Sequence, residues 1–157
     1  MAHFENADNY HLVPVGYLRR RGALMFLRKY KIRVRDAQMG IPPPTWVEEN
    51  GDRWTTRPLV KSTDEGSIPP DLQAFAGDNS AHELPYIFHD DAVASGGLYR
   101  NRNGVNEFVK LPRYRSDQML YQWVRADEGG RWEAFKIRCG AGLGTLWASL
   151  TRRGIRP

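Results

Sequence analysis

Hydrophobic periodicity changes along the chain, from the repeat of a β-strand to the repeat of an α-helix. The segment YKIRVR (30–35) alternates apolar and basic side chains, which is the two-residue period of a strand with one buried face and one basic face. The segment SDQMLYQWVRAD (116–127) instead places Asp117, Leu120 and Val124 on one side of a helix, at the i, i+3 and i+7 positions. Strands and helices are therefore expected in separate parts of the chain.

Turn-forming residues divide the first part into short strands. IPPP (41–44) cannot continue a sheet, because proline lacks the amide hydrogen that a ladder needs. Asn50-Gly51 is a strong hairpin signal between Trp46 and Trp54. The first sixty or so residues are thus predicted to form a small antiparallel sheet.

The second part has the start and stop signals of helices. Ser80 and Glu83 have capping-box spacing, so a first helix should begin between 80 and 85 and stop at Gly96-Gly97. A hairpin around Asn103-Gly104, a helix over 116–127 and a last helix over 132–150 follow. We therefore expect an α+β fold, with a small N-terminal antiparallel sheet followed by a helix–hairpin–helix–helix region.

Size and composition fit a single domain over residues 1–157. Its 41% hydrophobic and 26% charged residues are ordinary for a folded protein. We expect an N-terminal arm (1–17), a mainly β part (18–62), a mainly α part (63–150) and a tail (151–157). No apolar run approaches the roughly 20 residues of a membrane span, and the start does not resemble a secretory signal, so synthesis in the cytoplasm is expected. The one cysteine, Cys139, excludes an intrachain disulfide and is expected to be a buried, inert thiol.

Positive charge is concentrated early in the chain. The net charge is +5, and residues 19–35 contain no acidic residue. Such a cluster suits a nucleic acid, an anionic surface or an acidic protein, although a solvated strand face is the simpler interpretation. The basic residues of the predicted strand are Arg28, Lys29, Lys31, Arg33 and Arg35.

One group of residues could carry chemistry. His89 and Asp90 lie within the first predicted helix, and Asp117 opens the second. An Asp on a neighbouring helix can hold one nitrogen of His89 and leave the other to take a proton from water. Asp90 would then be available to bind a cation through oxygen. Helix-capping and surface roles are the alternatives for these residues. His3, His11 and His82 show no partner at a spacing that would indicate a site.

A rigid loop precedes this helix. It contains Asp64, Ser67 and the prolines Pro69 and Pro70 in TDEGSIPP. Together with FHDDAVASGGLYR, RSDQMLYQW and KIRCGAGLGTLW, it resembles the phage-associated family known as domain of unknown function 1353, over residues 24–150. The resemblance implies a phage or prophage origin and a site at Asp64, Ser67, Pro69, His89, Asp90 and Asp117. The sequence departs from that family at Asp91, Ala92 and Val93, where many members have an aromatic residue.

The layout is also similar to that of secreted phospholipase A2. In that family a His activates water, the next Asp binds calcium and a remote Asp orients the His. That similarity would assign His89 as base, Asp117 as its orienting carboxylate and Asp90 as ligand of a divalent cation such as calcium. Asp64 of the loop is a second candidate ligand. The sequence lacks that family's glycine-rich calcium loop and its disulfides, so the similarity concerns layout only.

Two functions are consistent with these residues. The first is a virion-associated protein, such as a tail, baseplate or neck component, assembled with other phage structural proteins into an oligomer. The second is a hydrolase of the cell envelope that acts on lipid ester or peptidoglycan through His89 and Asp117. Nucleic-acid binding ranks third, because the basic cluster has no recognisable reading module.

Overall fold

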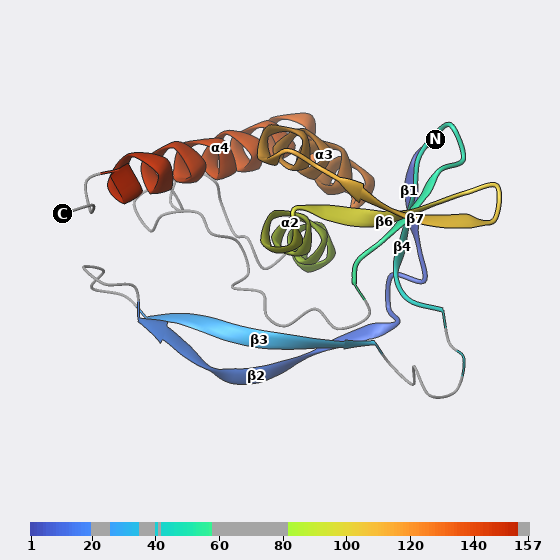
Figure 1. The fold of residues 1–157 in the computed structure, drawn as a ribbon, viewed down its shortest axis with the longest axis horizontal. Helices are drawn as coiled ribbons and strands as arrows, with labels where there is room; N and C mark the ends of the chain where they lie inside the picture. Colours follow the sequence, from blue (N-terminus) through green and yellow to red (C-terminus); the bar gives the residue numbers. More distant parts are fainter. Residues whose placement is uncertain (20–25, 35–39, 41, 58–81, 154–157) are drawn as a thin grey trace.

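The computed structural model describes residues 1–19, 26–34, 40, 42–57 and 82–153, and the side chains of residues 1–10, 40, 42–57 and 82–143. The predicted α+β class is confirmed: antiparallel strands come first and most of the helical residues follow (Figure 1). The predicted residues Asp64, Ser67 and Pro69 lie outside the described residues, as do Ser80 of the predicted capping box and Arg35 of the basic strand.

Five strands form the main sheet, in the order β1-β4-β5-β6-β7. Neighbouring strands are antiparallel throughout. The strands are β1 (His3–Glu5), β4 (Thr45–Val47), β5 (Arg53–Thr55), β6 (Gly97–Arg102) and β7 (Val105–Lys110). The Asn50-Gly51 turn joins β4 to β5 with Trp46 opposite Trp54, as predicted.

Two details differ from expectation. The hairpin around Asn103-Gly104 forms, but β6 pairs with β5, so the hairpin extends the sheet and does not stand apart between two helices. Residues 1–17, expected to be an arm, contribute β1 and most of β2 (Tyr10–Arg19). Strand β2 pairs with β3 (Phe26–Val34) in a separate two-stranded sheet. Strand β1 has only three residues, too few to show a periodicity in the sequence.

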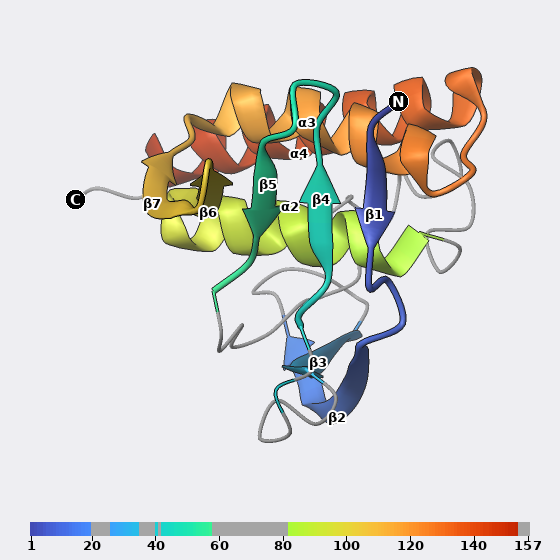
Figure 2. The ribbon, with the colours of Figure 1, turned by 90° about the vertical axis from the view of Figure 1, so that its right-hand side faces the viewer.

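The helices of the described part are α2 (Glu83–Ser95), α3 (Arg113–Ala126) and α4 (Arg131–Arg153). Helix α2 ends at Gly96 in the left-handed conformation, with φ of 75°, which favours glycine. One face of the main sheet packs against α2 and α3, and α4 lies beyond α3 (Figure 2).

Aromatic side chains fill the space between the sheet and the helices. The Phe88 ring of α2 lies 5.4 Å from that of Phe4 and 5.6 Å from that of Trp123, between ring centroids. Both Phe88 and Trp123 are fully buried. The smaller sheet is connected to this core at its start, where the hydroxyl of Tyr10 donates a 3.1 Å hydrogen bond to Glu83 of α2. The middle of α2, where His89 is located, therefore packs against this aromatic core.

The junction between α2 and β6 leaves no room for a side chain at Gly97. A methyl group there would lie 2.1 Å from the carbonyl oxygen of Val109 and 2.9 Å from the Phe108 ring. Gly97→Ala must therefore displace the backbone of β7, and we expect it to lower the free energy of unfolding by about 1–3 kcal/mol. Urea unfolding would measure this loss.

Gly142→Ala is the matched control for that substitution. A methyl group at Gly142 would meet nothing within 4 Å. Alanine should stabilise α4 by about 0.5–1 kcal/mol, because glycine is a poor helix former. Equal effects of the two substitutions would contradict the packing at Gly97.

Candidate functional site

His89 and Asp117 form a buried pair between α2 and α3. Nε2 of His89 lies 2.8 Å from Oδ1 of Asp117, which is a hydrogen-bonding distance. Only 7% of the His89 side chain and 12% of the Asp117 side chain are exposed. The predicted contact between these residues is thus present, and the packing of α3 on α2 positions it. Whether the pair catalyses a reaction stays a prediction.

Asp90 lies near the other ring nitrogen. Its Oδ1 is 3.7 Å from Nδ1 of His89, a distance that allows electrostatic attraction but is too long for a hydrogen bond. The structure gives the imidazole a carboxylate on each side, with Nδ1 as the nitrogen that is not bonded to Asp117. Binding of a cation by Asp90 stays a prediction.

Burial and the two carboxylates act on the pKa of His89 in opposite directions. Burial lowers the pKa, because the charged imidazolium loses its hydration. The hydrogen bond to Asp117 and the attraction of both carboxylates raise it, and the net result is a pKa above the usual value. The folded protein therefore holds the proton on His89 more tightly than the unfolded chain does.

This shift predicts how stability depends on pH. A histidine whose pKa is raised on folding stabilises the fold fully below its unfolded pKa of about 6.5, and the contribution is lost as pH rises through the folded value. The difference in unfolding free energy between the wild type and Asp117→Asn should therefore be largest at mildly acidic pH and shrink in alkaline solution. Urea unfolding from about pH 5 to pH 9 would measure it.

Asp52→Asn is the control for the pH series. Asp52 is buried and accepts a 2.6 Å hydrogen bond from Nε of Arg102. Arginine does not lose its proton in this range, so the cost of Asp52→Asn should not change with pH. A cost of Asp117→Asn that is equally flat would mean that His89 does not carry the proton in the folded protein.

The third residue of the HDD run has a structural role. The side chain of Asp91 is fully buried, and its two oxygens accept hydrogen bonds of 2.8 Å from the backbone amide and from Nε of Arg57. This pair attaches the segment after β5 to α2. The ion pair with Arg57 therefore accounts for the burial of an aspartate at this position.

A second histidine, His82, lies beside two carboxylates, a contact that was not predicted from the sequence. His82 is buried, and its Nδ1 lies 3.0 Å from Asp127 at the end of α3. Its Nε2 lies 3.4 Å from Glu133 in the first turn of α4. Burial raises the pKa of Asp127, and His82 opposes that rise. The three residues come from the start of α2, the end of α3 and the start of α4. Spacing in the sequence could not predict their contact, whereas the exact helix boundaries would have indicated it.

The residues expected to bind a metal do not form a site in the described part. No group of three or more His, Cys, Asp and Glu side chains there could hold a metal ion. The described surroundings of Asp90 thus do not fit a calcium ion by themselves, and we derive no chemical step from one. For Arg28, Lys29, Lys31 and Arg33, the structure places the backbone on β3, and their partner stays a prediction.

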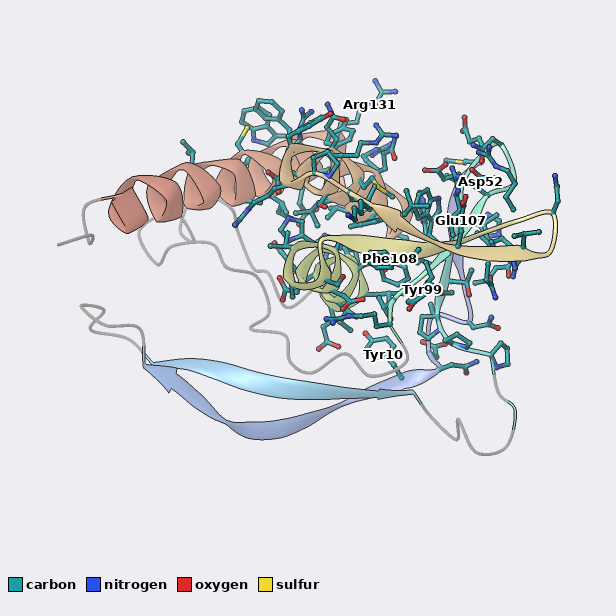
Figure 3. The ribbon with its side chains drawn as sticks, viewed as in Figure 1. Tyr10, Asp52, Tyr99, Glu107, Phe108 and Arg131 are labelled. Atoms are coloured by element: carbon teal, nitrogen blue, oxygen red, sulfur yellow. The ribbon has the colours of Figure 1, made fainter. Side chains whose placement is uncertain are left out.

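A surface cleft of about 510 Å³ lies away from the His89 pair, between the β4–β5 turn, α3 and the start of the chain. Trp46, Arg115, Tyr121 and Arg125 are among its lining residues, and neither His89 nor Asp117 is. The labelled Asp52 marks this end of the main sheet in Figure 3. The cleft is therefore separate from the candidate site.

Comparisons with known proteins found no match to a family model, to a curated protein or to a solved structure. No helix in the described residues is long and apolar enough to span a membrane.

Proposed function

We propose that the protein is a virion-associated component of a phage, in a tail, baseplate or neck, and that it carries a hydrolytic site based on His89. The observation that carries the hydrolytic part is the buried 2.8 Å contact between Nε2 of His89 and Asp117. The virion part depends on the resemblance of the TDEGSIPP, HDD and RSDQ segments to a phage-associated family.

The chemistry follows from the orientation of the imidazole. Asp117 accepts the hydrogen of Nε2 and thereby fixes the tautomer, so that the lone pair is on Nδ1. Nδ1 takes a proton from water as the water oxygen attacks the carbonyl carbon of an ester or amide. The proton then passes to the leaving group as the carbonyl–oxygen or carbonyl–nitrogen bond breaks. Lipid ester or peptidoglycan of the host envelope is the proposed substrate.

A purely structural role in the virion is the second candidate. It is favoured by the burial of His89 and by the carboxylates near both of its nitrogens. An imidazole with a raised pKa is more often protonated at neutral pH and then cannot accept a proton. In this case the pair would join α2 to α3 as an internal ion pair.

Two measurements test the proposal. Mass spectrometry of purified virions should detect the chain among the structural proteins, and its absence from intact particles would contradict the virion part. Release of fatty acid from phospholipid, or of soluble fragments from peptidoglycan, tests hydrolysis. The melting temperature should also be measured with and without calcium, because a bound ion would raise it by ligand linkage.

A further inference from the structure

Helix α4 carries apolar side chains on the side opposite to the protein core. Its buried residues Ala134, Ile137 and Ala141 face α3. On the outer side, Trp132 is 65% exposed, Phe135 45% and Leu143 49%. These exposed fractions are high for large apolar residues, and the residues line up along one helix. A contiguous exposed apolar patch of this kind marks an interaction surface more often than scattered residues do.

The spacing of these residues keeps them in one line. Trp132, Phe135, the half-buried Cys139 and Leu143 are separated by three, four and four residues, which places them on one helix face. We call this set the α4 stripe. The stripe covers the first half of α4, on the side opposite to Ala134, Ile137 and Ala141.

Two aromatic rings form the first part of the α4 stripe. The rings of Trp132 and Phe135 are stacked, with centroids 5.5 Å apart and planes 21° apart. Together they present a flat apolar surface to the solvent. Tryptophan and phenylalanine on an outward helix face are typical of helices that lie in the interfacial region of a membrane.

Cationic residues flank the stripe on both sides. Arg131 and Arg138 are exposed and lie on one flank, and the half-buried Lys136 lies on the other, by the 100° rotation per helical residue. Figure 3 shows Arg131 at the outer side of the helical layer. The acidic residue of this segment, Glu133, lies beside His82 and thus points away from the stripe. The surface around the stripe is therefore positively charged.

We propose that the α4 stripe docks the protein on an anionic phospholipid surface. The rings of Trp132 and Phe135 would enter the boundary between headgroups and acyl chains, and the flanking cations would contact phosphate groups. A second copy of the chain is a less suitable occupant, because two such helices would bring like charges together. Among the described elements α4 packs on α3, and the opposite side of a helix is a convex surface that a fluid bilayer accepts without a matching groove.

This inference does not depend on hydrolysis by His89, so its test uses binding and not turnover. The full-length protein is mixed with vesicles of phosphatidylglycerol and phosphatidylcholine, or of phosphatidylcholine alone, and the bound fraction is measured by sedimentation. We expect binding to the anionic vesicles to exceed binding to neutral vesicles at least tenfold, and to weaken as salt rises.

Two variants test the surface itself. Trp132→Ala combined with Phe135→Ala should reduce binding at least tenfold, because it removes the inserting rings. Arg131→Glu combined with Arg138→Glu should reduce it by about fivefold or more for each site. Tyr114→Ala and Arg115→Glu, both exposed on α3, are the matched controls and should bind as the wild type does.

Several results would overturn the proposal. They are failure of the wild type to bind anionic vesicles, equal binding to neutral vesicles, or undiminished binding by both α4 variants. Dimerisation of the wild type that is abolished by the Trp132 and Phe135 substitutions, without vesicle binding, would assign the stripe to a second copy. Loss of hydrolysis with vesicle binding retained would count against the proposed activity alone.

Discussion

Replacing His89 by glutamine is expected to lower the rate of envelope hydrolysis by roughly 100- to 10,000-fold, the usual contribution of a general base. Glutamine can still donate a hydrogen bond toward Asp117, but it has no basic nitrogen that could accept a proton from water. Because the base must be neutral, the wild-type rate should rise with pH through the raised pKa of His89 and then level off. Release of fatty acid and of peptidoglycan fragments at a series of pH values measures both effects.

Asp91→Asn separates catalysis from stability. Asp91 is also buried and is also ion-paired, to Arg57, but it has no proposed part in proton transfer. Asp91→Asn should therefore lower the melting temperature without changing the rate of hydrolysis by the folded protein. The hydrolytic proposal is wrong if the wild type releases no product from either substrate, or if His89→Gln and Asp91→Asn reduce the rate only as far as they unfold the chain. The His89 pair would then be an internal ion pair of a virion protein.

Local signals were sufficient to predict most of the fold. Asn50-Gly51 and Asn103-Gly104 specify tight turns by their backbone preferences, and Gly96 ends α2 by adopting a positive φ. Each of these signals acts within a few residues of the chain. The pairing of β6 with β5 was not predicted, because it joins segments more than forty residues apart that share no local pattern.

The candidate site shows the same limit. The His89–Asp117 contact could be predicted because start and stop signals place His89 within a first helix, helical spacing places Asp117 on a second, and a hairpin joins the two. The role of Asp91 could not, since its partner Arg57 follows a three-residue strand with no periodicity of its own. The His82 cluster was missed for a related reason: it depends on where three helices begin and end, and boundaries are the least certain part of a sequence prediction.

Trp123→Ala is expected to lower the free energy of unfolding by about 3–5 kcal/mol, the usual cost of removing a large buried aromatic side chain. Trp123 is fully buried on α3 and packs on Phe88, the residue before His89. For a chain of this size the melting temperature should fall by roughly 6–20 °C. The contact between His89 and Asp117 depends on the same α2–α3 interface, so any hydrolysis should fall as well, even below the new melting temperature.

Trp123→Phe is the control that shows whether packing causes this loss. The indole Nε1 of Trp123 has no hydrogen-bond partner among the described residues, so phenylalanine removes an unsatisfied polar group while it keeps an aromatic ring against Phe88. Its cost should therefore be well below that of alanine. Thermal melting of the wild type and both variants, followed by circular dichroism, makes the comparison. If Trp123→Ala melted within a degree or two of the wild type, the α2–α3 interface would not depend on this side chain, and the position of Asp117 against His89 would need another cause.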